Sequence, residues 1–358
     1  MQSSRSVTLV SCLFLFLPAF AIAADPPAAG RLHLLLNAED VIEQPTPSPQ
    51  SHRRGATDAV VHSLDKKIPA TATVTVDCTK GQSINDALTT PAITLTVEIH
   101  GICTENVVVT RPNTTLVGTS PAADGIRGDV GFPKRVVWIH GVGVAIQNLS
   151  IANGPRYGLY VDASGSAAVS NCDVFGNGVD GISSVSGFVT VASTTVHNSG
   201  RADLGAWAGG DIGCDHCTLS GSPIGTLGIS GSRLMLTNSS IQASVIAFGA
   251  AEHGFISFDT GSFASSIDVE DQSQLSISAG TQTADPSGFY ADETSSVVVD
   301  NHTLLFGSVS LVRFSNLSLR NGSKITGDLA CYSGANAWCE DPAAVGGSTT
   351  GCSACVKP

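Results

Sequence analysis

Between residues 144 and 241 the chain repeats one four-residue pattern every 22 or 23 residues: Asn148-Leu-Ser-Ile, Asn171-Cys-Asp-Val, Ser193-Thr-Thr-Val, His216-Cys-Thr-Leu and Asn238-Ser-Ser-Ile. The residues before each copy also align. One column contains Val144, Ala167, Val189, Ile212 and Leu234, and a second contains Ile146, Val169, Val191, Cys214 and Leu236. Because apolar and polar residues alternate along a β-strand, each repeat predicts two short strands that meet at a one-residue polar corner.

A third strand is predicted in each repeat, after a polar turn, by Gly158-Leu-Tyr-Val, Gly181-Ile-Ser-Ser, Gly205-Ala-Trp-Ala and Gly228-Ile-Ser-Gly. Three short strands per coil of 22 or 23 residues describe a parallel β-solenoid, and connections between parallel strands are strongly right-handed. The sequence therefore predicts an all-β, right-handed parallel β-helix. Residues 82–88 have the spacing of a short amphipathic helix that begins after Ser83, and we expect this helix to cap the N-terminal end.

The repeats, from about residue 74 to 326, resemble the pectin-lyase-like right-handed β-helix superfamily of secreted proteins. Two segments are similar to motifs of its enzymes. Asn177-Gly-Val-Asp-Gly-Ile182 resembles the Asn-Thr-Asp-Gly-Ile of polygalacturonases, and Val137-Trp-Ile-His140 resembles the Trp-Ile-Asp-His of pectate lyases. The Asp-Asp, Gly-His-Gly and Arg-Ile-Lys motifs of polygalacturonases are missing, so the resemblance implies the fold and matches no specific enzyme family.

Composition indicates the cellular setting and the domain boundaries. Residues 1–23 have the basic start, apolar run and small-residue end of a secretory signal, which predicts a secreted protein with no transmembrane segment. Residues 24–72 are interpreted as a linker or propeptide, residues 73–330 as the β-helix domain, and residues 331–358 as a Cys-rich tail or cap. The net charge of −12 argues against nucleic acid or an anionic membrane as the partner.

The cysteines suggest disulfides, since these persist outside the cytosol. Cys78 and Cys103 flank the cap and the first coil and are predicted to be bonded, whereas the four cysteines of the tail allow three pairings. Cys214 and Cys217 have the spacing of a zinc or redox site, but both occupy apolar columns. We therefore favour two core-facing thiols over a local disulfide or a metal site, and no metal ligands are predicted.

Since the inward residues of a solenoid form its core, function is expected on outward strand residues and turns. Outward residues near the third strand are unusually rich in aromatic and charged types. The predicted substrate-binding residues are Tyr157, Tyr160, Asp162, Trp207 and Asp211. Tyr160 and Trp207 are expected to hold the same outward position two coils apart, where their rings would stack on sugars. The alternative interpretation is that these are ordinary solvated residues.

Asp180 and Asp203 lie one coil apart and offset by one position, which suggests an acid/base pair. Together with Arg156 and Arg201 they are the predicted catalytic residues. A uronate lyase would additionally need Ca²⁺ at the acidic residues, because no lysine lies between Lys134 and Lys324; no other cofactor is predicted.

The sequence thus predicts that the protein binds an extracellular or cell-wall polysaccharide, and uronate-containing polysaccharides are among the candidates. Whether the protein also cleaves or modifies this polysaccharide is left open. As an enzyme it would be a polysaccharide lyase, a glycoside hydrolase or an epimerase. The alternative is a non-catalytic surface solenoid of the adhesin type.

Overall fold

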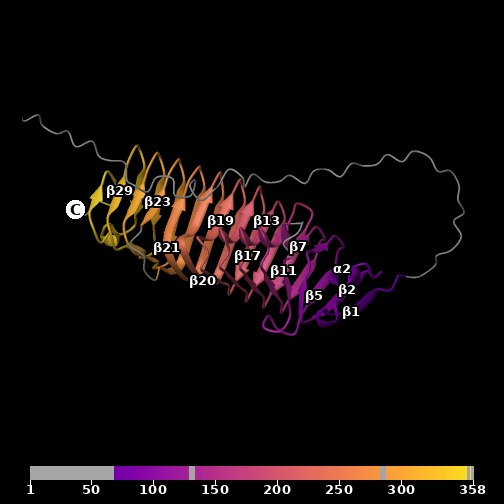
Figure 1. The fold of residues 1–358 in the computed structure, drawn as a ribbon. Helices are drawn as coiled ribbons and strands as arrows, with labels where there is room; N and C mark the ends of the chain where they lie inside the picture. Colours follow the sequence, from indigo (N-terminus) through magenta and orange to yellow (C-terminus); the bar gives the residue numbers. More distant parts are fainter. Residues whose placement is uncertain (1–67, 129–133, 283–287, 353–354, 356–358) are drawn as a thin grey trace, which may run out of the picture.

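The computed structural model describes residues 68–128, 134–282, 288–352 and 355, and all its strand pairs are parallel. The strands stack into a long solenoid (Figure 1) with three ladders, one for each strand of a coil. The chain is an all-β, right-handed parallel β-helix, as the sequence predicted. Within the described ranges, no helix has the length and apolar character needed to cross a bilayer.

The three ladders are named in the order in which a coil enters them. The first contains β1 (Thr71–Asp77), β2 (Thr94–His100), β5 (Thr114–Val117), β8 (Val144–Gln147), β11 (Ser166–Ser170), β14 (Phe188–Ala192), β17 (Asp211–Asp215), β24 (Ser296–Asp300), β27 (Asn316–Leu319) and β30 (Asn336–Cys339). The second contains β3 (Ile102–Thr104), β6 (Gly125–Arg127), β9 (Ser150–Ala152), β12 (Asp173–Phe175), β15 (Thr195–His197), β18 (Thr218–Ser220), β25 (Leu304–Leu305) and β28 (Lys324–Ile325).

The third ladder contains β4 (Val107–Val109), β7 (Arg135–Ile139), β10 (Tyr157–Val161), β13 (Asp180–Val185), β16 (Ala202–Trp207), β19 (Ile224–Ile229), β23 (Phe289–Ala291), β26 (Val309–Leu311), β29 (Leu329–Cys331) and β31 (Thr349–Thr350). Three longer strands pass through more than one ladder: β20 (Arg233–Ala251), β21 (Phe255–Val269) and β22 (Gln274–Gln282). The 3-10 turns η2 (Cys78–Lys80) and η3 (Pro342–Ala344) complete the described elements with the short helix α2 (Ile84–Ala87).

The predicted register of the first two strands is confirmed. Ala167 pairs with Val144 and Val189, and Val174 pairs with Ile151 and Val196. The corner residues Asn148, Asn171, Ser193, His216 and Asn238 all have positive φ, between 47° and 54°. Asn tolerates this left-handed conformation better than most residues, which explains why the residues of the corner column are mostly small and polar.

The predicted register of the third strand was wrong at two of its four glycines. Leu159 pairs with Ile182, but Gly205 pairs with Ser183 and Leu227, two residues from its predicted place. The reason is the inner face: Leu204 belongs to the core, so Gly205 faces outward, whereas a Cβ on Gly181 would lie 2.3 Å from the core residue Val196. Glycine occurs on both sides of this ladder and therefore cannot define its register.

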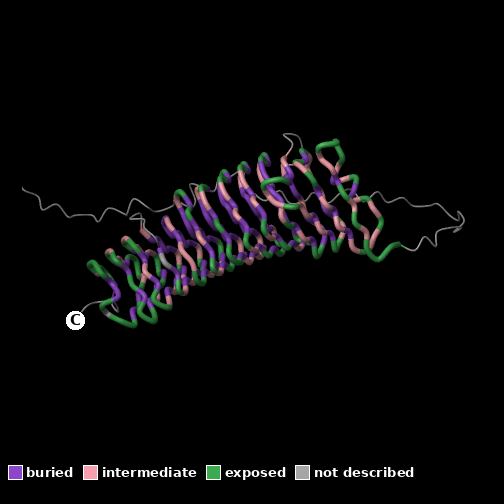
Figure 2. Tube along the Cα trace, turned by 90° about the horizontal axis from the view of Figure 1, so that it is seen from below, coloured by how far each residue is buried: buried purple, intermediate pink, exposed green. Residues whose placement is uncertain are grey.

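The core runs the length of the solenoid, and Figure 2 shows buried segments in every coil with exposed residues at the corners. The regular coils are filled by aliphatic columns. Where β20 and β21 break the regular spacing, Phe248, Phe258 and Phe263 pack together with ring centroids 5.1–5.7 Å apart.

The disulfide predicted between Cys78 and Cys103 is present, and the tail contains Cys331–Cys352 and Cys339–Cys355. The prediction of free thiols at Cys214 and Cys217 was wrong. Both side chains do face the core, at 3% and 2% exposure, but they form a disulfide with each other. They flank the left-handed corner at His216, which brings their Cα atoms within 6.0 Å, inside the bridging range.

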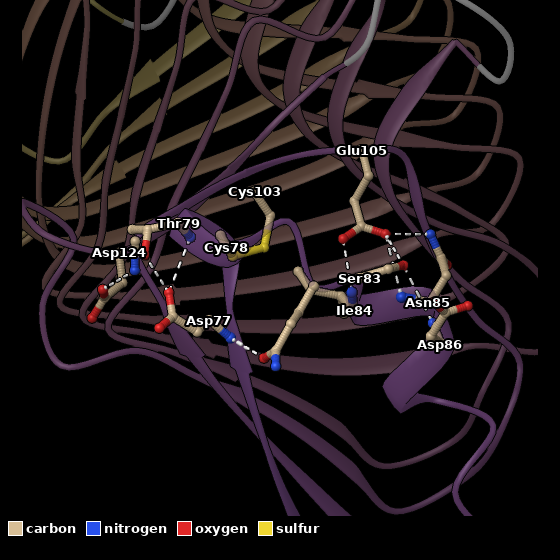
Figure 3. The surroundings of a disulfide bond; sticks show 12 residues. Asp77, Cys78, Thr79, Ser83, Ile84, Asn85, Asp86, Cys103, Glu105 and Asp124 are labelled. Carbon is tan, nitrogen blue, oxygen red and sulfur yellow. Dashed lines mark hydrogen bonds between the residues drawn. A yellow bond between two sulfur atoms is a disulfide. The ribbon is translucent and has the colours of Figure 1, made fainter.

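The N-terminal end is organised around α2 and the first disulfide (Figure 3). The Ser83 hydroxyl accepts a hydrogen bond from the Asp86 amide and donates one to the Glu105 carboxylate, which also accepts one from the Ile84 amide. A carboxylate from the next coil thus holds the helix start. That this helix closes the end of the solenoid stays a prediction.

The predicted domain boundaries can be compared with the structure at the C-terminal end but only in part at the N-terminal end. The signal segment 1–23 and residues 24–67 of the linker lie outside them. At the other end, parallel pairing continues past residue 330, because β30 pairs with β27 and β31 with β29. The Cys-rich tail therefore contributes strands to the ladders.

Candidate functional site

The predicted site residues gather mainly on one surface, the outer surface of the third ladder. Along β7, β10, β13 and β16 the inward column is Val137, Leu159, Ile182 and Leu204, all fully buried in the core. The outward column beside it is Trp138, Tyr160, Ser183 and Gly205. Successive members of such a column lie ~4.8 Å apart, so this surface presents a stepped line of side chains along the solenoid.

Aromatic rings and guanidinium groups stack at the N-terminal part of this surface. The Arg135 Cζ lies 4.4 Å from the Trp138 ring centroid and 4.1 Å from that of Tyr160, and the Arg156 Cζ lies 5.5 Å from that of Tyr157. The two tyrosine rings are 5.1 Å apart. We call these five residues the aromatic patch. Tyr160 is buried and the other four are half-buried, so edges of the rings and guanidinium groups remain accessible.

Asp162, a predicted substrate-binding residue, holds part of this patch in place. Its Oδ2 accepts a 3.1 Å hydrogen bond from the Trp138 Nε1 and lies 2.5 Å from the His140 Nδ1. The Trp138 and His140 rings are themselves 4.2 Å apart. With its carboxylate used in this way and 7% exposure, Asp162 orients the Trp138 indole rather than facing solvent.

Sequence reasoning missed Arg135, Trp138 and His140. The signal was present in Val137-Trp-Ile-His140, which lacks the acidic residue of the motif it resembles. The structure supplies a carboxylate from the following coil, because Trp138 pairs with Tyr160 and so places Asp162 beside His140. Only the pairing between coils reveals this partner.

Further along the surface, Arg201 and Asp180 form a buried bidentate ion pair. The Arg201 Nε and Nη2 each donate a 2.9 Å hydrogen bond to one oxygen of Asp180, and both residues are at least 93% buried, with exposures of 7% and 0%. The Arg201 Cζ also lies 4.2 Å from the Trp207 ring centroid. This fork geometry is the strongest common arrangement of an arginine and a carboxylate, and it fixes both side chains.

Asp203 lies on the other side of the strand from Asp180. Asp180 pairs with Ala202, so Asp203 is offset by one residue, as predicted, and one residue reverses the side. Its Oδ1 accepts a hydrogen bond from Ser222, a fully buried residue. Burial raises the pKa of Asp203 to about 8, an effect that the nearby Asp180 charge reinforces and the Ser222 hydrogen bond opposes. The two carboxylates therefore do not face a common space.

Two other expectations about the site need correction. Tyr160 and Trp207 do not share an outward position: Tyr160 pairs with Ser183, whereas Trp207 pairs with Val185, two residues further along. Asp211 is not on this surface, because it begins β17 in the first ladder, 4.0 Å from the Arg233 Nη1. Among the residues that the structure describes, no group of three or more His, Cys, Asp or Glu side chains is arranged to hold a metal ion.

Comparisons with known proteins find similarity in structure alone. No family model matches the sequence. No curated protein matches it either. The solved structures that resemble it include the pectate lyase Pel9A, at 11% identity over 77% of this chain and 78% of that one, with a TM-score of 0.42. They also include a pectin methylesterase mutant in complex with a hexasaccharide, at 15% identity, 64% and 79% coverage and a TM-score of 0.35.

A tailspike protein from Acinetobacter baumannii bacteriophage Fri1, described as a capsular polysaccharide depolymerase, matches at 8% identity over 74% of this chain and 57% of that one, with a TM-score of 0.37. Likeness at this level concerns the solenoid architecture, which the strand register already establishes. The case for a function therefore has to come from this chain's own side chains.

Proposed function

We propose that this protein binds an acidic polysaccharide along the outer surface of the third ladder, with the aromatic patch as the principal contact. The observation that carries the proposal is the placement of the aromatic side chains. The chain has three Trp and four Tyr, and Trp138, Tyr157, Tyr160, Trp207 and Tyr290 all lie on this one surface. Trp138 and Tyr157 are half-buried and keep part of their rings accessible, which suits contact with the apolar face of a sugar ring.

Charge favours an anionic ligand. The protein carries a net charge of −12, yet Arg135 and Arg156 lie together in the aromatic patch with Lys134 next to them. A guanidinium group binds a carboxylate with two parallel hydrogen bonds, which fits the uronate units of an acidic glycan. A local cationic area on an acidic protein also directs such a ligand to one place on the surface.

The proposal is binding rather than cleavage. Asp180 is fixed in the ion pair with Arg201, and Asp203 faces the interior, so one glycosidic bond cannot be flanked by both carboxylates. The four disulfides among the described residues fit a compartment outside the cytosol, and we extend the proposal to a secreted protein that meets its glycan there.

A binding screen tests this function. The chain is titrated with polygalacturonate, alginate and chondroitin, and with neutral dextran, with and without calcium. We expect binding of at least one acidic glycan, and Trp138→Ala should weaken it by about 1 to 3 kcal/mol, the scale of a lost aromatic contact. Trp338→Ala is the matched control, since Trp338 is 47% exposed on β30 in the first ladder.

Equal affinity of the Trp138→Ala and Trp338→Ala variants would show that the glycan does not bind at this surface. No binding of any acidic glycan would refute the proposal and favour a solenoid with a structural, adhesin-like role.

A further inference from the structure

The sequence contains three Asn-Gly pairs, Asn153-Gly154, Asn177-Gly178 and Asn321-Gly322, and the structure places them in different environments. In such a pair the glycine amide nitrogen can attack the asparagine side chain, because glycine has no Cβ to hinder the approach. The rate of this reaction depends on whether the nitrogen and the side chain are free to meet. The hydrogen bonding and burial of each pair therefore decide which pair reacts.

The first two pairs lie on adjacent coils and protect each other. The Gly154 amide donates a 2.9 Å hydrogen bond to the Asn177 Oδ1, and the Gly178 amide donates one of 2.9 Å to the Gly154 carbonyl oxygen. The Asn177 side chain is also 1% exposed. Each attacking nitrogen is thus already used as a donor, and breaking a buried hydrogen bond costs free energy before any attack begins.

Asn321 and Gly322 form an exposed, left-handed corner after the first ladder, and this corner is the last of its kind. One coil earlier, Asn301 and His302 make the same corner, and the His302 amide donates a 2.9 Å hydrogen bond to the Asn321 carbonyl oxygen. After β30 the chain instead enters η3 through Asp341, whose φ is −110°. Without a following corner to accept it, the Gly322 amide donates no hydrogen bond to any described residue.

We propose that Asn321 is a site of spontaneous deamidation, at which the folded protein converts an asparagine into isoaspartate or aspartate. The Gly322 nitrogen attacks the Asn321 Cγ, and the new N–C bond closes a succinimide ring. The Cγ–Nδ2 bond breaks, and Nδ2 leaves as ammonia with the proton that the Gly322 nitrogen loses. Water then opens the ring: cleavage of the ring bond at Cγ gives aspartate, and cleavage at the main-chain carbonyl gives isoaspartate.

Two hydrogen bonds to carboxylates hold Asn321 before the reaction. Its Nδ2 donates a 2.6 Å hydrogen bond to the Asp300 Oδ1, and its main-chain amide donates one of 2.5 Å to the Glu340 Oε2. Both bonds lie at the exposed corner, where water can replace them. Local opening therefore needs less free energy at Asn321 than at the buried Asn177.

The product places a new carboxylate beside two others. Where the Asn321 Nδ2 donated to Asp300, aspartate presents an oxygen, so attraction becomes repulsion, and Glu340 adds a further negative charge at the same corner. Isoaspartate also inserts a methylene group into the main chain, which disrupts the corner. The Cys339–Cys355 disulfide keeps the last strand of the first ladder attached, so we expect loosening around the corner rather than loss of the end.

Ageing of the full chain tests the proposal without any glycan, so its outcome is independent of the proposed function. The folded protein is incubated in neutral buffer and digested, mass spectrometry measures conversion of amide to acid, and an isoaspartyl methyltransferase identifies isoaspartate. We expect conversion at Asn321 at least tenfold faster than at Asn153, Asn177 or Asn301. Asn301 is the matched control, since it occupies the same corner one coil earlier but precedes histidine. A smaller ratio, or no conversion at Asn321, would overturn the inference.

The same measurement on the reduced chain in guanidinium chloride separates the effect of the fold from that of the local sequence. Once unfolded, Asn177 loses its burial and hydrogen bonds, so it should react at a rate similar to that of Asn321. If Asn177 stays at least tenfold slower in the unfolded chain, the fold does not select Asn321 and the inference fails.

A substitution tests the effect of the new charge. Asn321→Asp reproduces one product and should speed amide exchange severalfold in residues 316–345, with no change in β8 and β11, because the added repulsion favours local opening. High salt should reduce the difference, since it screens exposed charges. Asn321→Gln is the control, because it keeps an uncharged amide at the corner. Equal exchange in the two variants would contradict the predicted loosening.

Discussion

The outer surfaces of the first and third ladders belong to the same coils, yet they differ in almost every property that concerns function. The first ladder exposes its outward residues, including Phe188 and Met235. The third ladder carries the aromatic patch, a buried ion pair and a second apolar cluster around Trp207 and Leu227, whose members are at most 7% exposed. The repeat therefore determines what faces inward on these ladders, while the outward residues differ from one ladder to the other.

The largest expected effect is the difference in stability between a substitution on the inner side and one on the outer side of the same strand. Ile146 is fully buried in the core, whereas the next residue, Gln147, is exposed. Ile146→Asp buries an unpaired charge and should unfold the chain, a loss of more than about 4 kcal/mol. Gln147→Asp should change stability by less than about 0.5 kcal/mol. Thermal denaturation followed by circular dichroism measures both, and a cooperatively folded Ile146→Asp would disprove the register of the first ladder.

The next effect concerns the inner side of the third ladder and depends on pH. Asp203 has its pKa raised to about 8 in the folded chain, chiefly by burial, against about 3.9 when unfolded. The folded state therefore binds the proton more tightly, and this carboxyl lowers stability progressively as the pH rises from about 4 to 8. Asp203→Asn removes that penalty and keeps the oxygen that accepts from Ser222. It should stabilise the chain by about 1 to 4 kcal/mol at pH 7.

Melting temperatures of the Asp203→Asn variant and the parent across pH 4 to 8 provide the check. The gain should shrink toward pH 4, because Asp203 is protonated in the folded state throughout this range and becomes about half protonated in the unfolded state near pH 4. A gain that does not depend on pH would show that the Asp203 carboxyl is not buried in its neutral form.

A smaller effect compares the outer sides of the two ladders directly. A Cβ added at Gly205 in the third ladder would lie 2.7 Å from the Asp180 Oδ2 and 2.8 Å from the Trp207 Nε1, whereas one at Gly213 in the first ladder meets nothing within 4 Å. Gly205→Ala should therefore cost about 1 to 3 kcal/mol by overpacking. Gly213→Ala should be neutral or slightly stabilising. Urea denaturation measures the difference, and equal free energies of unfolding would mean that the two surfaces are equally open.

The sequence predicted the inside of the solenoid better than the outside. The columns headed by Val144 and Ile146 were correct because apolar residues must recur wherever the strands stack. The third strand was misaligned at Gly205, since a glycine fits either side and carries no periodic signal. The disulfide between Cys214 and Cys217 was not favoured, because two separate apolar columns do not show that the left-handed corner between them brings the two cysteines together.

For the candidate site, the sequence predicted several residues of this surface but not their arrangement. Asp180, Arg201 and Trp207 were predicted and do lie together. Asp203 was predicted with them, yet an offset of one residue turns its carboxyl to the interior, a difference that spacing alone does not resolve. The contact of His140 with Asp162 joins adjacent coils 22 residues apart, so it depends on a register that only the structure provides.

Hydrogen exchange with a bound ligand tests the central claim, that the functional surface is the outer side of the third ladder. Amide exchange of the full chain is compared with and without a saturating acidic oligosaccharide from the binding screen. Slower exchange is predicted in residues 134–162, around β7 and β10, with no change in β11, β14 and β17 of the first ladder. Slower exchange in the first ladder, with none in β7 and β10, would contradict the account.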